Sequence, residues 1–431
     1  MVARDGASFT RSCILPSVPQ SEVNMRKIAG IDVHKQVLIV AIADAANPEL
    51  VLQKGKFGTG HAELGRLRTV LQQAEVKEVV MESTAQYWRP VWSELEPSFT
   101  LHLAHAQSNR APKGRKSDWA DAKRLLKRFA AEELFLSFVP DPEQRDWRML
   151  TRARYALVRD HVHLQNQIEA LLEQASIKLS SVVSDLFGVS GLRILWALSL
   201  GQTDPAKLAD LADGHLRCGR EALVDALRGR FGEVHRPLLE QALQRLRMLS
   251  EQIAALNQLA AKRMQLHASA VQRLIEVPGV GAEAAQAILA EIGPTAAAFP
   301  SSAQMASWMG VCPGTQESAG HNHSGRCPKG NRYIRSLLCQ VAHAAVRSKG
   351  SHLQMVFRKF LTKLGCYNKA IWAVAHKICK IIWHILHNGV HYLESGHAVN
   401  PKAVQKAIEH HLKALRRLGY ILPSSTPEPQ V

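Results

Sequence analysis

A serine lies in a glycine-rich loop in the C-terminal half of the chain. Residues 310–331 read GVCPGTQESAGHNHSGRCPKGN, and glycine and proline at this density exclude a helix or a buried strand. The loop offers the hydroxyl of Ser318, the backbone amides beside its glycines, and the cations Arg326 and Lys329. Attack on a phosphodiester requires such a nucleophile and such donors, because negative charge develops on the phosphate oxygens. The loop therefore predicts a phosphoryl-transfer site, and a solvated basic loop without chemistry is the structural alternative.

Basic residues surround this loop. Residues 301–380 hold 12 Lys and Arg against one acid, Glu317, and the whole chain has a net charge of +17. With a pI near 9.7, this balance indicates a polyanionic partner, although it names no reaction. Aromatic residues are only 6% of the chain, so stacking of bases on aromatic side chains is not the expected binding mode.

Four acids in the N-terminal part could form a metal site. Asp32 follows an apolar run, Glu82 ends a second one, and Asp118 and Asp121 are three residues apart on a predicted helix. Carboxylates gathered this way repel one another and need Mg²⁺ or Mn²⁺, and two such ions can hold both oxygens of a phosphoryl transfer. Singly, Asp118 and Asp121 could instead be first-turn acids favoured by the helix dipole, and Asp32 a turn residue. The preceding basic loop, a predicted phosphate track, supplies Lys113, Arg115 and Lys116.

The elements that must position these acids form an α/β pattern over 25–135. Apolar runs and helical spacings predict the order strand, strand, strand, helix, strand, helix, strand, helix. The ranges are 26–33, 37–44, 49–57, 61–74, 76–83, 84–96, 99–105 and 117–130. We expect residues 1–24, which lack the apolar core of a signal peptide, to be either a disordered leader or an upstream start-site artefact before Met25.

Two long amphipathic stretches follow. Residues 143–182 contain no Gly or Pro, and 238–268 repeat the same apolar spacing. In the first stretch the predicted apolar positions are Leu150, Ala153, Leu157, Leu164, Ile168, Leu171, Ala175 and Leu179. This pattern predicts an antiparallel coiled-coil arm over 143–270, with short helices in an insert at 185–233. We expect a structural or oligomerisation role there.

The sequence pattern of residues 271–415 predicts a mostly helical C-terminal domain. Residues 271–293 read as helix, PGVG turn, helix, typical of a helix-hairpin-helix that holds nucleic-acid backbone near Gly279 and Gly281. A plain helical hairpin is the alternative. After the serine loop, a helix over 331–348 begins with Arg332 and Arg335, two further predicted nucleic-acid contacts. We expect a tail over 416–431, disordered from 422.

The cysteines argue against a metal or disulfide framework. Seven scattered cysteines without a CxxC pair predict reduced thiols in a cytosolic protein, and no apolar run is long enough to span a membrane. Cys312, His321, His323 and Cys327 match no standard zinc-finger spacing, so we expect no zinc.

Two blocks of the sequence resemble one known family. IAGIDVHK, VVMEST and KSDWADAKRL resemble the RuvC-like domain of DEDD transposases, and PGVG, ASWMGVCPGTQESAG and SGRCPKGNRYIRSLL resemble the C-terminal domain of the same family. The family is the bridge-RNA-guided insertion-sequence one-ten family. The resemblance implies a ribonuclease-H-like fold, Mg²⁺ on Asp32, Glu82, Asp118 and Asp121, and a catalytic serine at Ser318, with Ser324 as the second choice.

The resemblance also implies a function and partners. It implies a DNA transposase of a bacterial insertion sequence that forms a covalent phosphoserine link to DNA, uses a guide RNA, and acts in the cytoplasm near the nucleoid. The arm would associate protomers into a dimer or tetramer and touch RNA. His321, His323 and Cys327 make this loop less basic than in many relatives, which could tune DNA affinity. A metal-only nuclease or junction resolvase, and a non-catalytic nucleic-acid-binding relative, remain open at this point.

Overall fold

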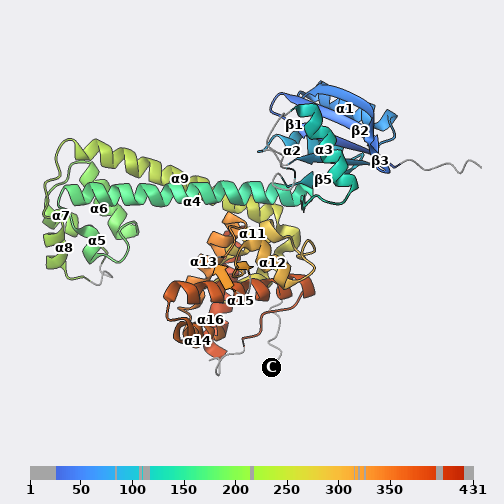
Figure 1. Cartoon of the computed structure of the whole chain (residues 1–431). Helices are drawn as coiled ribbons and strands as arrows, with labels where there is room; N and C mark the ends of the chain where they lie inside the picture. The colour runs from blue at the N-terminus through green and yellow to red at the C-terminus, as the bar shows by residue number, and fades with distance from the viewer. Residues whose placement is uncertain are drawn as a thin grey trace, which may run out of the picture. The chain divides into compact units, whose positions relative to one another are not determined.

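The computed structural model describes residues 26–82, 85–105, 109, 117–213, 218–314, 316–318, 321–324, 327–394 and 401–421. The predicted leader 1–24 and the predicted contacts Lys113, Arg115, Lys116 and Arg326 lie outside these residues. The chain forms two compact units, one up to Val139 and one from Pro140 (Figure 1). Among the helices of the described residues, none has the length and apolar character needed to cross a bilayer.

The first unit has the predicted element order, with one extra strand at its end. The elements are β1 (Lys27–Val33), β2 (Val37–Asp44), β3 (Asn47–Gly58), α1 (His61–Gln73), β4 (Glu78–Glu82), α2 (Trp88–Leu95), β5 (Thr100–Ala104), α3 (Asp118–Ala130) and β6 (Leu136–Ser137). Ser117 caps α3, because its side chain accepts a hydrogen bond from the amide of Ala120.

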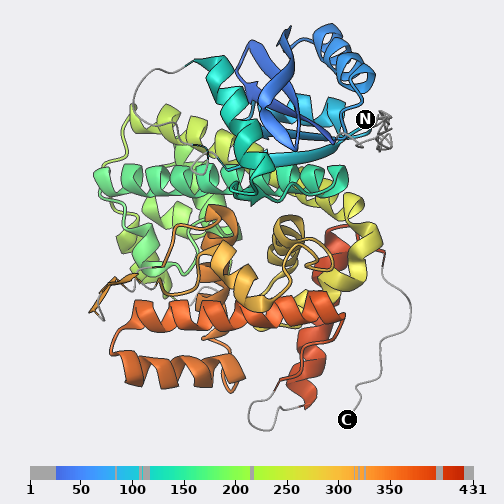
Figure 2. The same cartoon turned by 45° about the vertical axis from the view of Figure 1, so that its right-hand side comes forward.

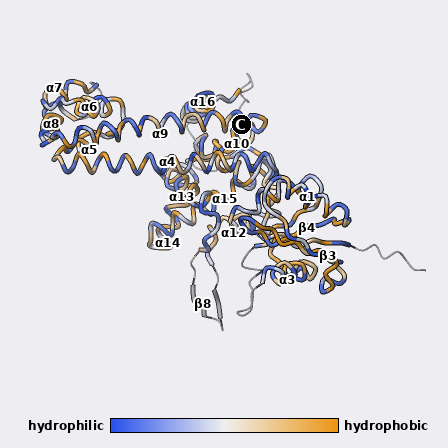
Figure 3. The backbone as a smooth tube through the Cα atoms, turned by 90° about the horizontal axis from the view of Figure 1, so that it is seen from above, coloured by the Kyte–Doolittle hydropathy of each residue, from blue (hydrophilic) through white to orange (hydrophobic). Residues whose placement is uncertain are grey.

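The strands form one sheet in the order β3-β2-β1-β4-β5-β6. The first three strands pair antiparallel, and β1, β4 and β5 run parallel. This is the ribonuclease-H-like arrangement that the sequence predicts. Apolar side chains of α1 and α2 pack on one face of the sheet, and those of α3 pack on the other. The central strands are accordingly apolar along most of their length (Figure 3).

The second unit is almost entirely helical. Its elements are α4 (Pro142–Gln174), α5 (Leu179–Val182), α6 (Val189–Ser199), α7 (Pro205–Ala209), α8 (Arg220–Ala226), α9 (His235–Arg263), the 3₁₀ helix η1 (Gln265–His267), α10 (Ala268–Ile275), α11 (Ala282–Ile292), α12 (Ser302–Met309), β7 (Gln316–Ser318), β8 (His321–Ser324), α13 (Arg332–Ala345), α14 (His352–Leu364), α15 (Tyr367–Asn388) and α16 (Pro401–Arg417).

Helices α4 and α9 lie side by side, and the short helices α5–α8 pack around their far end (Figure 1). The predicted apolar stripe holds in the second half of α4, where Leu164 and Ile168 are buried. It is wrong in the first half, where Ala153 is exposed. The buried positions there are Gln144, Trp147, Thr151 and Arg154. This half of α4 also packs on α11, so polar contacts replace the regular apolar spacing.

Helices α10 to α16 share a second core, in which α14 and α15 run side by side (Figure 2). The predicted tail is wrong for residues 416–421. Tyr420 is 3% exposed, and its hydroxyl accepts a hydrogen bond from Gln286 on α11. Gln265 also exchanges hydrogen bonds with the backbone of Ile421, so the ordered core extends six residues further than the sequence predicts.

Candidate active site

The acid site is built where α3 comes close to the end of β1. Side chains alternate along a strand, so Ile28, Gly30 and Asp32 share the face of β1 that α3 covers. A Cβ on Gly30 would lie 2.8 Å from Leu126 Cγ and 2.9 Å from the backbone oxygen of Ala122. Only glycine therefore allows α3 to lie this close to the strand, which brings the start of the helix to Asp32.

Asp32 and Asp118 meet there, together with His34. The Nε2 atom of His34 lies 3.1 Å from Asp32 Oδ2 and 3.8 Å from Asp118 Oδ1. One ligand atom from each of the three residues lies within 4.8 Å of the other two. Asp32 is largely enclosed, with 12% of its side chain exposed, whereas 53% of the Asp118 side chain is exposed. The cluster is thus open to a ligand on the side of Asp118.

The other two predicted acids are held by polar partners. Asp121 Oδ1 accepts a hydrogen bond of 2.5 Å from Arg124 Nη2, one turn further along α3. Glu82, at the end of β4, accepts a hydrogen bond of 2.8 Å from Asn109 Nδ2. Asn109 is only 4% exposed, and its Oδ1 has no hydrogen-bond partner among the described residues.

The pKa of Asp32 shows that the four acids are close enough to interact. Burial raises the pKa of this carboxyl above its ordinary value of 3.8. His34 opposes that shift, and the charges of Asp121, Glu82 and Asp118 add to it. Among the described residues, Asp32 and Asp118 are thus the two predicted acids that meet within ligand distance, while Asp121 and Glu82 act on Asp32 through their charge.

These residues fit a divalent metal ion. Two carboxylates and an imidazole converge on one region. Burial, and after it the neighbouring carboxylates, raise the pKa of Asp32, and a bound cation would offset both effects. The unpaired Oδ1 of Asn109 adds a further oxygen next to Glu82. The donor set is mostly oxygen, which suits Mg²⁺ or Mn²⁺.

The serine loop contains a small β-hairpin that the sequence did not predict. Strands β7 and β8 pair antiparallel, with Ser318 opposite His321 and Gln316 opposite Ser324. The two predicted serines thus lie on different strands of one hairpin. The two-residue spacing between the strands, with Gly320 in it, was the available sequence signal.

The base of this loop is fixed by the start of α13. Asn331 caps the helix, because its Oδ1 accepts hydrogen bonds from the amides of Tyr333 and Ile334. Its own amide donates to the backbone oxygen of Trp308 at the other end of the loop. Its Nδ2 donates to Glu291 at 2.8 Å, which ties the cap to α11.

Glu291 in turn is held by the arm helix α4. Its side chain is 3% exposed and accepts two hydrogen bonds from the guanidinium of Arg152, at 2.7 and 2.9 Å. Arg148 donates to the backbone oxygen of Glu291 at 2.6 Å. A continuous polar network therefore joins α4, α11 and the end of the serine loop.

The predicted nucleic-acid contacts of the C-terminal domain differ in their surroundings. Lys329 and Arg332 are exposed, although Arg332 also donates to the hydroxyl of Tyr333. Arg335 is engaged within the protein, since it donates to the backbone oxygens of Pro328 and Lys329 and lies over the ring of Trp372. We therefore assign Arg335 to holding the loop, and contact with phosphate remains a prediction for Lys329 and Arg332.

The two glycines of the predicted helix-hairpin-helix also differ. Gly279 has φ +87°, and a Cβ there would lie 2.5 Å from the backbone oxygen of Val341 on α13. The close approach at Gly279 is therefore made to the chain's own helix, not to a partner. Gly281 precedes α11, and a Cβ there would meet nothing within 4 Å, so the structure leaves space for a side chain at this position. Backbone contact with nucleic acid remains a prediction for Gly281.

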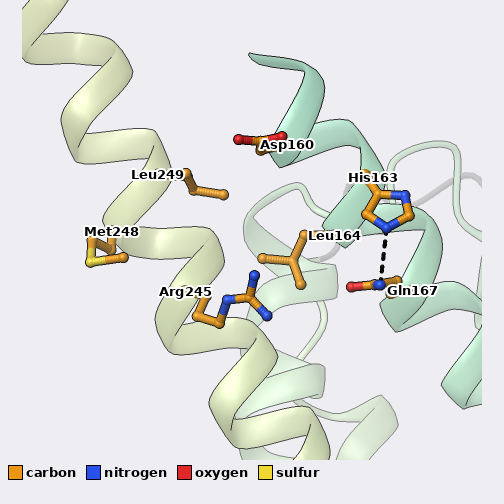
Figure 4. Close-up of a pocket in the computed structure, with 7 residues that line it drawn as sticks. All are labelled: Asp160, His163, Leu164, Gln167, Arg245, Met248 and Leu249. Carbon is orange, nitrogen blue, oxygen red and sulfur yellow. Dashed lines mark hydrogen bonds between the residues drawn. The ribbon is translucent and has the colours of Figure 1, made fainter. Parts of the chain in front are cut away.

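A separate pocket lies between the two arm helices (Figure 4). It has a volume of about 170 Å³, and apolar and charged side chains from both helices line it. His163 Nε2 and Gln167 Nε2 form a hydrogen bond at its edge. Asp160 and Arg245 supply its charged groups, and it contains none of the predicted site residues.

His34 and Asn109 are the site residues that sequence reasoning missed. His34 is two residues after Asp32, a spacing that puts side chains on the same side of an extended segment, and this was the available sequence signal. Asn109 gave no such signal, because its contact with Glu82 joins segments 27 residues apart. The side chains of His321 and His323, where we expect no zinc, lie outside the described ones. Cys312, from the same set of residues, has its Sγ atom 3.9 Å from His376 Nε2.

Two families match the sequence, and their matches contain the two groups of site residues. A DEDD transposase family of IS110 type matches residues 29–177, which include the four acids. The Transposase IS116/IS110/IS902 family matches residues 271–357, which include the serine loop. Together the matches span more than half of the chain.

Whole-length relatives give the same assignment. A probable family 20 transposase of Pseudomonas aeruginosa is 26% identical over 375 residues, which are 84% of this chain and 97% of that protein. The transposase for insertion sequence element IS1111A of Coxiella burnetii is 24% identical over 371 residues, covering 84% and 89% of the two chains.

Among solved structures, T. thermophilus RuvC in complex with a Holliday junction substrate aligns over 26% of this chain and 99% of its own, at 13% identity. Its TM-score of 0.20 is too low to support an argument. The family matches and the relatives support one assignment without it. This chain belongs to the DEDD transposases of the IS110 family, and it is an enzyme of DNA transposition.

Proposed function

We propose that this transposase cuts and rejoins DNA strands through a covalent link between Ser318 and a DNA phosphate, with a divalent metal ion at the acid site. One observation supports the proposal most strongly. Asp32 and Asp118 converge within ligand distance, and Asp121 and Glu82 are close enough to act on the charge of Asp32. Such a carboxylate cluster has a clear use in phosphoryl transfer and a clear electrostatic cost without a cation.

The acid residues would hold the ion, most directly through Asp32 and Asp118. When bound, Mg²⁺ or Mn²⁺ would neutralise the phosphate and stabilise the charge that develops on its oxygens. Arg124 orients Asp121, and Asn109 orients Glu82, so both carboxylates are set before a substrate arrives. The free-energy cost of ordering these two carboxylates is thus met when the protein folds, before substrate binds.

Ser318 would act as the nucleophile. Its Oγ forms the bond to phosphorus, the bond from phosphorus to the 3′ oxygen breaks, and the 3′ oxygen leaves as a hydroxyl. The serine loses its proton in this step, and the leaving oxygen gains one, so the charge is balanced. The 3′ hydroxyl can later attack the phosphoserine, which rejoins strands and frees the serine.

The substrate would be duplex DNA at the element ends and at the target. The support is the net charge of +17 and the cluster of basic residues in 301–380, including the exposed Lys329 and Arg332. We further propose, on family resemblance, that a guide RNA selects the target by base pairing. The same resemblance supports a coiled-coil arm, a dimer or tetramer, and action in the cytoplasm at the nucleoid.

A cleavage assay tests the proposal against a nuclease that uses water and metal alone. The protein would be incubated with element-end DNA, co-expressed flanking RNA and Mg²⁺. We expect Ser318→Ala and Asp118→Ala to abolish cleavage, each by at least about a thousandfold, as loss of a catalytic group does in other enzymes. Ser324→Ala, on the paired strand of the hairpin, is the matched control and should cleave normally.

Other outcomes would redirect the proposal. Cleavage by Ser318→Ala at the wild-type rate would favour a metal-only nuclease. Cleavage lost in Ser324→Ala but kept in Ser318→Ala would move the nucleophile to the second serine. DNA binding without cleavage in any variant or in the wild type would favour a nucleic-acid-binding relative that has lost its chemistry.

A further inference from the structure

His34 stands at the acid site without an assigned role. It follows β1 and turns the chain toward β2, since its amide donates to the backbone oxygen of Val37 at 3.0 Å. The side chain points back to the acids, with Nε2 at 3.1 Å from Asp32 Oδ2 and 3.8 Å from Asp118 Oδ1. Of the His34 side chain, 38% is exposed, so a ligand can reach it.

The two distances favour a shared ion over a simple hydrogen bond. A hydrogen bond accounts for the contact with Asp32, but 3.8 Å to Asp118 is too long for one. Ligands about 2.1 Å from one metal ion lie about 3 Å apart at a right angle and about 4 Å apart on opposite sides. Both distances from His34 fall in this interval.

We propose that His34 is a nitrogen ligand of the divalent ion at the acid site and shifts its preference from Mg²⁺ toward Mn²⁺ and other first-row transition ions. The proposal rests on the proposed metal role of Asp32 and Asp118. Mg²⁺ strongly favours oxygen ligands, whereas an imidazole strengthens binding of transition ions in the order of their general affinity for nitrogen. One nitrogen in an otherwise oxygen-rich set therefore changes selectivity more than it changes charge.

The test uses Mn²⁺ alone with the full-length protein. Pulsed electron paramagnetic resonance detects ¹⁴N coupled to bound Mn²⁺, which reports ligation independently of catalysis. We expect a ¹⁴N coupling in the wild type and its loss in both His34→Ala and His34→Gln, while Mn²⁺ still binds. His102→Ala is the matched control, because His102 also contacts a carboxylate, Glu78, at 3.0 Å in the same unit, and its coupling should be unchanged.

Calorimetry with the two ions gives a second readout. Loss of an imidazole ligand should weaken Mn²⁺ binding at least about tenfold and change Mg²⁺ binding by less than about threefold, so the selectivity ratio falls. Equal loss for both ions would overturn the proposal, because it would mean that His34 only orients Asp32. Bound Mn²⁺ without ¹⁴N coupling, or coupling that survives in His34→Ala, would also overturn it.

The failure of the underlying metal site would look different. If Asp118→Ala left Mn²⁺ binding unchanged, or if the wild type bound no Mn²⁺, both the acid site and the role of His34 would be rejected. If binding required Asp118 but showed no nitrogen, only the inference about His34 would be rejected.

Discussion

At the scale of single residues, Asp32 shows how a residue suited to binding a metal ion can destabilise the fold that contains it. It is enclosed between β1 and α3 and lies among three other acids and His34. Burial and the neighbouring carboxylates raise its pKa, which means that the folded protein disfavours its charged form. The residue is therefore a cost to stability in the absence of a cation and a source of affinity for one.

Replacing Asp32 with Asn should stabilise the metal-free protein at neutral pH. Because the folded pKa lies above the ordinary value of 3.8, the ionised carboxylate destabilises the folded state at pH 7, and this cost vanishes below 3.8, where both states are protonated. We expect the first unit of Asp32→Asn to melt about 3–5 °C higher at pH 7 in a chelator, for a gain of about 1 kcal/mol.

Two further melting experiments complete this measurement, one at low pH and one with added metal ion. Near pH 3 the two proteins should melt alike, provided both remain folded. With Mg²⁺ or Mn²⁺ added, the wild type should gain stability and Asp32→Asn should not. A lower melting temperature for Asp32→Asn in the chelator would contradict the account of repulsion at this site.

At the scale of elements, the end of the serine loop is held by contacts from distant helices. Asn331 caps α13, Glu291 on α11 accepts from Asn331, and Arg152 on α4 pairs with Glu291. These residues come from three helices, so the loop is anchored by tertiary contacts and not by its own sequence. Buried ion pairs of this kind confer little stability, but breaking one leaves a buried charge unpaired.

Arg152→Ala should therefore destabilise the second unit strongly. Removal of the guanidinium leaves the buried Glu291 with Arg148 at 3.7 Å as its remaining ion-pair partner among the described contacts. We expect a loss of about 2–4 kcal/mol in urea unfolding, and partial recovery in Arg152→Ala/Glu291→Gln. Arg247→Ala, which breaks an exposed pair with Glu251 on α9, is the control and should cost less than about 1 kcal/mol. Equal costs for the two variants would refute the network.

The turn between α10 and α11 offers a second paired prediction. Gly279→Ala should destabilise the protein by about 2–4 kcal/mol, because φ is +87° and the new Cβ would collide with α13. Gly281→Ala should fold normally, since nothing lies within 4 Å of its Cβ, yet it should weaken DNA binding several-fold by crowding the amides at the start of α11. Wild-type DNA affinity in Gly281→Ala would argue for a plain helical hairpin.

Local patterns predicted the first unit well and the contacts between distant elements poorly. Apolar runs, such as those around Ile28 and Val79, are separated by segments whose apolar residues have clear helical spacing. The order of strands and helices therefore follows from the periodicity of the sequence. The burial of Arg154 could not be predicted from the sequence, because the residues that accept its hydrogen bonds, Asn257 and Gln286, are more than 100 residues away. Tyr420 was assigned to a tail for the same reason, since its partner Gln286 lies 134 residues away.

The residues of the candidate site divide in the same way, into those that local patterns predict and those whose contacts depend on the fold. The four acids were found because each ends or begins a recognisable element, whereas Asn109 was missed because its pairing with Glu82 depends on the fold. The roles of the acids and of Ser318 remain predictions from resemblance and chemistry. The hairpin of β7 and β8 adds a framework for the serine loop that glycine content alone did not indicate.

At the scale of the whole molecule, the acids lie in one compact unit and the serine loop lies in the other. The chain as a whole is strongly basic, with 54 Lys and Arg against 37 acids. Attraction to the phosphate backbone acts at long range and does not depend on base sequence.

DNA binding should therefore depend steeply on salt. For six to ten phosphate contacts, affinity falls about 10³–10⁵-fold between 50 and 200 mM salt. We expect this range for the wild type, and a slope reduced by about one in each of Lys329→Ala and Arg332→Ala. Lys207→Ala, at a basic residue of α7 outside the loop, is the control. Affinity that does not change with salt would mean that charge is not the basis of binding.

The central claim is that Ser318 becomes covalently linked to DNA with the help of the acid site. The most direct measurement is to denature a reaction containing element-end DNA, flanking RNA and Mg²⁺, isolate DNA-linked protein, and locate the nucleotide on a peptide by mass spectrometry. The account predicts a phosphodiester on Ser318 that is absent in Ser318→Ala and in Asp118→Ala. Cleaved DNA without any linked peptide, or a link that persists in Ser318→Ala, would contradict it.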